Sequence, residues 1–235
     1  MLKLSTYKTF TIEEDIIHHL MFQTFFHKRN GLFYGKLGIA IVFFELGRYR
    51  NNLVYTDYAE DLKNLLPNKI NDKMTLDFAT GLSGYGWGVE YMVQQQFIDN
   101  DNTEICTDID RNIMLMNIQR LSDLSLEKGL EGFLHYILIR IVGAKIKKIP
   151  IPFDKQYLKD TYIRLQSIPD EEISNGLCYL KQAFVSYLDT GLLNYRPDIS
   201  LFINAIELNN EEDIFSAKLG LSNGLAGNLL KIVNR

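Results

Sequence analysis

Two carboxylates and one histidine are the residues of this 235-residue chain best suited to acid–base chemistry. Asp77 and Glu127 each precede a glycine-rich turn, and His135 lies one helical turn beyond Glu127's turn. Paired carboxylates can act as general acid and general base, as in glycoside hydrolysis, although acidic residues also stabilise helix N-termini without any active site. His135 is interpreted as a hydrogen-bonded core histidine, with proton transfer as the alternative.

Two hydroxyl–amide pairs, Ser174-Asn175 and Ser222-Asn223, stand directly before two further glycine-rich turns. Serine and asparagine are favoured N-cap residues, so capping alone accounts for them. Helix N-termini also attract anions and peptide carboxylates, which makes the pairs candidates for substrate binding as well. The residues that precede the glycine in the other turns join them as candidate binding residues: Tyr34, Thr80 and Lys128.

The two cysteines, Cys106 and Cys178, lie 72 residues apart, and neither belongs to a CxxC motif. Reduced cysteines and a cytoplasmic location are therefore expected. Cys178 is the one candidate metal ligand, but a zinc site there needs two or three further ligands. A small buried side chain is the simpler interpretation of Cys178, and no cofactor is predicted.

The element that positions these residues is a repeat marked by glycine. The first glycines of five turns, at positions 35, 81, 129, 176 and 224, are separated by 46, 48, 47 and 48 residues. Such regular spacing predicts one structural unit repeated five times. We expect the first glycine to allow a backbone conformation that a side chain opposes. A second glycine three residues later, replaced by Tyr179 in the fourth copy, is expected to let neighbouring helices approach closely.

Each turn leads into a segment that is apolar on nearly every face, as is typical of a buried helix. The intervening segments mix apolar and charged residues at helical spacing, which predicts surface helices near residues 12–26, 55–66, 109–121, 157–168 and 199–208. No strand pattern of useful length is present. The sequence therefore predicts one all-α domain over residues 1–235, in which five helical hairpins form an α/α toroid or an open arc of one.

Three of the turns resemble those of the lanthionine synthetase C family, the LanC-like cyclases of lanthipeptide maturation. The resemblance is carried by GLFYGKLGIA at residues 31–40, GLSGYGWG at 81–88 and GLSNGLAG at 220–227, of which the second has the typical family spelling GLxGxGWG. Family members usually have seven hairpins. The resemblance implies an α/α toroid and, in active members, zinc-assisted addition of a peptide cysteine to a dehydrated serine or threonine.

The resemblance also places the zinc ligands, two cysteines and a histidine, in these turns, with the cysteine two places before the first glycine. In this chain that place holds other residues in every copy: Phe33, Ala79, Glu127, Ser174 and Ser222. Serine and asparagine are poor zinc ligands because they are neutral and hard. We therefore predict a degenerate LanC-like protein without catalytic zinc.

Such a protein is expected to bind a peptide or to act as a scaffold in a peptide-modification or secretion system. The alternatives are a metal-free enzyme that uses Asp77, Glu127 or His135 on a peptide or carbohydrate, and a lanthionine-type cyclase with an atypical metal site.

Charge and hydropathy limit the class of partner. The net charge is −4 without a long block of one sign, so nucleic acid is not expected as a partner. His135 and Arg140 interrupt the apolar stretch 133–144, so no membrane span is predicted. A peptide or protein partner remains, such as a modification enzyme or a transporter. An open arc would also expose apolar flanks that favour a homo-oligomer.

Overall fold

The computed structural model describes residues 11–67, 69–70, 74–99, 104–208 and 211–233. These residues confirm the all-α class, and their α-helices are α1 (Ile12–Gln23), α2 (Lys36–Arg50), α3 (Leu53–Asn64), α4 (Leu82–Gln94), α5 (Glu104–Met114), α6 (Leu130–Lys147), α7 (Lys155–Gln166), α8 (Asn175–Thr190), α9 (Glu211–Ser216) and α10 (Leu225–Val233). Single turns of 3₁₀-helix add η1 (Thr24–Phe26), η3 (Ile118–Arg120), η4 (Asp170–Glu172) and η5 (Ile199–Phe202). No helix within these ranges is long and apolar enough to cross a membrane.

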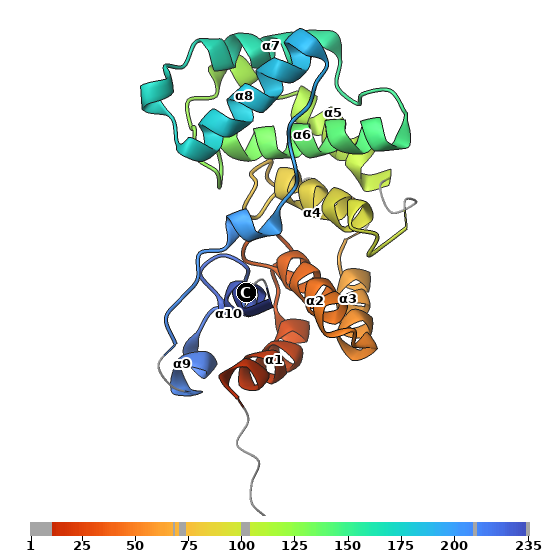
Figure 1. Cartoon of the computed structure of the whole chain (residues 1–235), viewed down its shortest axis with the longest axis vertical. Helices are drawn as coiled ribbons and strands as arrows, with labels where there is room; N and C mark the ends of the chain where they lie inside the picture. Colours follow the sequence, from red (N-terminus) through yellow and green to blue (C-terminus); the bar gives the residue numbers. More distant parts are fainter. Residues whose placement is uncertain (1–10, 68, 71–73, 100–103, 209–210, 234–235) are drawn as a thin grey trace, which may run out of the picture.

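The helices that follow the glycine-rich turns form a continuous row. Helix α10 packs against α2, α2 against α4, α4 against α6, and α6 against α8. In Figure 1 this row runs from α8 at the top of the view to α10 in its lower half. Four of these helices begin one residue after the first glycine of their turn, whereas α8 begins at Asn175, directly before Gly176.

The remaining long helices cover the row from outside. Helix α3 packs against α2, α5 against α4, and α7 against α8, while α1 packs against α10 and α9. Local caps fix where several of them begin: Thr11 and Glu14 form a capping box on α1, and the Asp154 carboxylate accepts from Tyr157 N at 2.7 Å on α7. The surface helices expected from residues 12–26, 55–66, 109–121 and 157–168 therefore correspond to α1, α3, α5 and α7.

The prediction of a fifth surface helix, over residues 199–208, is wrong. Only η5 forms there: Ile203 is extended, Asn204 forms a bridge with Ser222, and residues 205–208 have no regular secondary structure. Asn223 N donates to Asn204 O at 2.8 Å, and the Asn228 amide bonds both Ile206 N and Ile206 O at 2.8 and 2.7 Å. Because these partners satisfy the backbone of this segment, helix formation is not required.

The prediction that the first glycine adopts a backbone conformation which a side chain opposes is also wrong. Gly81 and Gly129 have φ of −104° and −110°, values that any residue adopts. Space is the actual constraint, since a Cβ at Gly81 would overlap Thr75 O and a Cβ at Gly129 would overlap Asp123 O. The turn folds back over the start of its own helix and leaves no room for a side chain.

The second glycine was expected to bring neighbouring helices close together, but it instead lies against the turns. A Cβ at Gly132 would overlap Leu126 O in its own turn and Phe78 Cβ in the turn that precedes α4. A Cβ at Gly84 would likewise overlap Phe78 O. These glycines therefore let successive turns nest at one end of the row, rather than bringing helix against helix.

Candidate functional site

The turns before α2, α4, α6 and α10 meet at one end of the row, and we call residues 31–35, 77–81, 125–129 and 220–224 the loop rim. Their backbones are hydrogen-bonded in sequence: Ser222 N donates to Phe33 O at 3.1 Å, Phe33 N to Ala79 O at 2.9 Å, and Ala79 N to Glu127 O at 3.0 Å. All of these residues stand two places before a first glycine. The loop rim thus gathers the equivalent position of successive repeats.

The turn before α8 joins the loop rim through side chains. Ser174 Oγ donates to Glu131 Oε2 at 2.7 Å and also accepts from Leu177 N at 2.9 Å, which makes Ser174 the N-cap of α8. Asn175, the first residue of α8, is exposed. The expected capping role therefore applies to Ser174.

Ser222 and Asn223 have backbone roles instead. Their N–H groups donate to Phe33 O and Asn204 O, and residues Ser222 and Asn204 form a parallel bridge. Asn223 has φ of 53°, a left-handed conformation that asparagine tolerates better than most residues. This pair thus holds a stretch of the chain against the loop rim.

A hollow of about 550 Å³ opens at the loop rim beside Glu127, and we call it the Glu127 hollow. The Tyr34 hydroxyl donates to Glu127 Oε1 at 2.7 Å. Burial, and then the Glu127 carboxylate, raise the pKa of Tyr34. Lys128 lines the same hollow and is exposed. Four of the predicted residues, Tyr34, Glu127, Lys128 and Ser222, therefore lie together, and they come from three turns.

A second hollow of about 520 Å³, the His135 hollow, lies between the starts of α6 and α8. It shares three lining residues with the Glu127 hollow: Leu126, Leu201 and Phe202. Its polar lining consists of Glu131, His135, Asn175, Tyr179, Arg196 and Asp198. Burial raises the pKa of Glu131, an effect that the Ser174 hydroxyl opposes.

His135 lies at the inner side of this hollow with 4% of its surface exposed. The Tyr195 hydroxyl lies 2.9 Å from His135 Nδ1 and accepts from Trp87 Nε1 at 3.0 Å. Burial lowers the pKa of His135 to about 3. The ring is therefore neutral near neutral pH, where it is poorly suited to general acid catalysis.

Asp77 and Thr80 are hydrogen-bonded to each other within the turn before α4. Asp77 Oδ1 accepts from Thr80 N at 2.7 Å and from Thr80 Oγ1 at 3.0 Å. Asp77 is not among the residues that line the Glu127 hollow, and Thr80 lines a separate hollow of about 340 Å³ with Gly31 and Tyr85. The structure therefore does not bring Asp77 and Glu127 to a common hollow.

The donor set at the loop rim does not suit zinc. The places of the family's ligands hold carbon side chains, one carboxylate and two hydroxyls, and Cys178 Sγ accepts only from Gln182 Nε2 at 3.5 Å. Within the described ranges, no group of three or more His, Cys, Asp or Glu side chains is arranged to hold a metal ion. No chemical step through zinc is therefore derived for this chain.

Sequence reasoning missed a buried ionic cluster that joins α4, α5 and α6. Arg140 donates to Glu90 Oε2 at 2.6 Å and to Asp110 Oδ2 at 2.7 Å. All three residues are buried, and Tyr136 donates a further hydrogen bond to Asp110. The available signal was a glutamate and an arginine inside segments that are otherwise apolar on every face. The cluster is remote from the loop rim and has a structural role.

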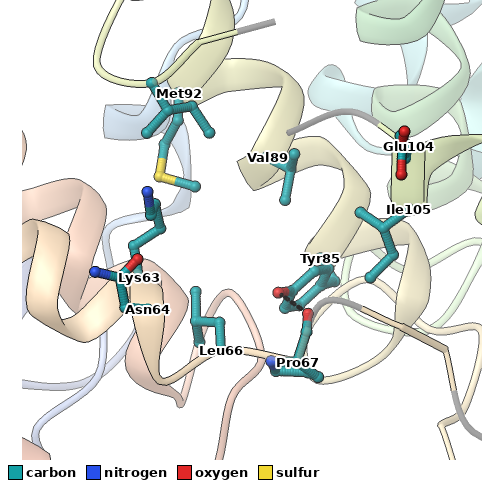
Figure 2. Close-up of a pocket in the computed structure, with 10 residues that line it drawn as sticks. Lys63, Asn64, Leu66, Pro67, Tyr85, Val89, Met92, Glu104 and Ile105 are labelled. Carbon is teal, nitrogen blue, oxygen red and sulfur yellow. Dashed lines mark hydrogen bonds between the residues drawn. The ribbon is translucent and has the colours of Figure 1, made fainter. Parts of the chain in front are cut away.

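A further hollow of about 330 Å³ lies between α3, α4 and α5, away from the loop rim (Figure 2). Its Tyr85 hydroxyl already donates to Pro67 O at 2.7 Å. Lys63 and Glu104 lie on opposite sides of the hollow, as Figure 2 shows, while Val89 and Ile105 supply apolar walls. Its polar groups do not converge, so we do not regard it as the functional site.

Comparison with known proteins adds no relative: no family model matches the chain, and no curated protein matches it significantly. The functional interpretation consequently depends on the geometry of the loop rim and on the motifs of the chain itself.

Proposed function

We propose that this chain is a degenerate LanC-like protein without catalytic zinc, which binds a peptide at the loop rim. The row of turn-following helices is then an open arc of an α/α toroid. The observation that carries the proposal is the loop rim itself, where hydrogen-bonded turns surround two adjoining hollows but the places of the LanC zinc ligands hold neither cysteine nor histidine.

The size and chemistry of the hollows support a peptide as the ligand. Volumes of about 550 and 520 Å³ lie within the usual range for ligand sites. The hollows adjoin at Leu201 and Phe202, so one extended ligand can reach both. Lys128 and Arg196 provide positive charge and Asp198 negative charge, which suits the mixed groups of a peptide.

A stretch of the chain itself, residues 203–206, already lies against the loop rim. Ser222 and Asn223 pair with this stretch through the main chain, and the Asn228 amide bonds both main-chain groups of Ile206. Main-chain pairing of this kind is a common way to bind peptides. It supports a peptide over a carbohydrate.

The biological setting is part of the same proposal. A zinc-free LanC-like chain would hold a peptide, or dock it to a modification enzyme or transporter, in the cytoplasm. A degenerate scaffold of this kind has no need of the thiolate chemistry that active family members perform.

Selection from a random peptide library tests the proposal. The protein is treated with a chelator, and the selected peptides are measured against the double variant Lys128→Ala/Asn175→Ala, which changes one exposed side chain at each hollow. The matched control is Lys155→Ala/Asn112→Ala, which makes the same substitutions on α7 and α5. We expect the selection to recover peptides. These peptides should bind Lys128→Ala/Asn175→Ala more weakly than the parent protein and should bind the control variant as tightly as the parent. Recovery of no peptide, or equal weakening by both variants, would contradict the proposal.

A further inference from the structure

We propose that His135 and Glu131 form a subsite for one peptide group in the His135 hollow. His135 Nε2–H donates to a backbone carbonyl of the ligand, and the Glu131 carboxylate accepts from a backbone N–H of the same ligand residue. The inference depends on the proposed function of the loop rim, and it specifies which atoms of a peptide are recognised there.

The hydrogen-bond network assigns the tautomer of His135. An indole N–H can only donate, so the Tyr195 oxygen accepts from Trp87 Nε1 at 3.0 Å. The single hydroxyl proton of buried Tyr195 then has one acceptor among the described residues, His135 Nδ1 at 2.9 Å. Since Nδ1 accepts, the ring proton of the neutral histidine is on Nε2.

Among the described residues, the His135 ring makes its hydrogen bond at Nδ1 and none at Nε2. The buried side-chain N and O atoms without a partner in this part of the chain are those of Ser83 and Tyr157, so Nε2 is not sealed in the interior. Because His135 is 4% exposed and lines the His135 hollow, Nε2 is accessible from that hollow. An oxygen of a ligand in the hollow can therefore accept from it.

Glu131 stands four residues earlier on α6, and therefore on the same helix face. Its Oε2 accepts from Ser174, while its Oε1 lies next to the Cα of Gly176 at the wall of the hollow. A donor and an acceptor thus stand side by side. They complement an extended peptide, in which the N–H and C=O of one residue point to the same side.

The charges around the hollow favour a neutral carbonyl over a carboxylate. The charged residues that line the hollow are two acidic ones, Glu131 and Asp198, against one basic one, Arg196. A ligand carboxylate would be repelled by this excess, whereas a peptide carbonyl would not.

Nuclear magnetic resonance of the full-length protein, labelled with ¹⁵N at histidine, tests the subsite directly. At neutral pH we expect the Nε2–H tautomer for His135. We expect the blocked peptide acetyl-Gly-Gly-amide to shift the Nε2 and Hε2 signals of His135 but not the signals of His18, His19 or His27. Sodium acetate should leave all of them unchanged. An Nδ1–H tautomer, a response to acetate instead of the peptide, or no response up to the solubility limit of the peptide would overturn the inference.

Two variants separate the subsite from a general structural effect. Tyr195→Phe removes the donor to Nδ1, so both tautomers become populated. Because only the Nε2–H form binds, equal populations should lower the affinity for the blocked peptide about twofold. Tyr58→Phe is the matched control, because it removes the hydroxyl of another buried tyrosine, one that donates to Leu20 O at 3.1 Å and does not line this hollow. It should change neither tautomer nor affinity, and equal losses in the two variants would contradict the assignment.

Glu131→Ala provides a second test if Tyr195→Phe does not fold. It should weaken binding of the blocked peptide about fivefold, the effect of one hydrogen bond, while the His135 tautomer stays unchanged. Unchanged affinity contradicts the role of Glu131. Library peptides that bind the loop rim without shifting His135 would contradict the subsite alone, whereas failure of every peptide to bind would contradict the proposed function.

Discussion

Among single residues, His135 has a direct consequence for how stability depends on pH. Burial lowers its pKa from 6.5 to about 3 in the folded protein. Below the ordinary pKa the unfolded chain binds a proton that the folded chain does not, so the free energy of unfolding falls as pH drops from 6.5 towards 3. The slope from this residue approaches about 1.4 kcal/mol per pH unit.

Urea unfolding of the parent and of His135→Gln, between about pH 7 and about pH 5, measures this contribution. The glutamine variant does not titrate, so its stability should depend less on pH even if it is less stable overall. The other histidines are common to both proteins and cancel in the comparison. Parallel curves would show that His135 does not have a lowered pKa.

The ionic cluster gives a second prediction at this scale. Arg140→Met leaves Asp110 buried without its cation and leaves Glu90 with Lys147 alone, whose Nζ lies 3.6 Å from Glu90 Oε1. We expect a loss of about 3–5 kcal/mol in the free energy of unfolding. Arg111→Met is the matched control, because Arg111 pairs with Asp108 on the exposed face of α5. It should cost less than about 1 kcal/mol by the same denaturant measurement. Similar losses would mean that the cluster is not effectively buried.

Part of the site was predictable at residue scale because it follows from the repeat. The repeat gives Phe33, Ala79, Glu127 and Ser222 equivalent places, two before a first glycine, and in the structure backbone hydrogen bonds join them. The contact of His135 with Tyr195 could not be predicted, since it joins residues 60 apart through a segment outside any repeat element. Local pattern contains no information about such a pair.

At the scale of the helices, the spacing of the glycines predicted where the buried helices begin. It did so because the packed turns leave no room for a side chain at the same place in each repeat. Segment 199–208 was mispredicted for an equally physical reason. Apolar residues recur there at the spacing of a helix face, at Ile199, Phe202, Ile203 and Ile206. Beyond η5, however, the backbone of this segment forms hydrogen bonds with Asn223 and Asn228 instead of helical ones. Tertiary partners overrode the local periodicity.

The close packing of the turns predicts how one added methyl group changes the free energy of unfolding. Gly132→Ala places a Cβ against Phe78 and the Leu126 carbonyl, and overpacking of this kind should lower the free energy of unfolding by about 1–3 kcal/mol. Tyr179 occupies the equivalent place in the fourth turn and is 40% exposed, so Tyr179→Ala should have a smaller effect. Thermal or denaturant unfolding compares the two. A stable Gly132→Ala protein would indicate that the turns are not tightly nested.

At the scale of the whole molecule, the chain between α8 and α10 ties the two ends of the row together (Figure 1). Its Phe202 ring contacts four rings from other parts of the chain, with centroid distances of 5.6 Å to Phe33, 5.2 Å to Phe78, 4.8 Å to Trp87 and 5.0 Å to His135. One side chain thus joins the turns before α2 and α4 to the interiors of α4 and α6.

Phe202→Ala should therefore lower the free energy of unfolding by about 3–5 kcal/mol, the usual cost of removing a buried phenylalanine. The neighbouring Leu201 is 56% exposed, so Leu201→Ala serves as the matched control and should change stability much less. Both are compared by urea unfolding. Equal effects would indicate that the segment does not tie the row together through Phe202.

The central claim is that the loop rim binds peptide without zinc, and calorimetric titration of one library-selected peptide tests it most directly. We expect the same dissociation constant with and without a zinc chelator. We also expect a constant weaker by about tenfold, equivalent to about 1.4 kcal/mol, in Lys128→Ala/Asn175→Ala. Binding that disappears with the chelator and returns with added zinc would contradict the claim.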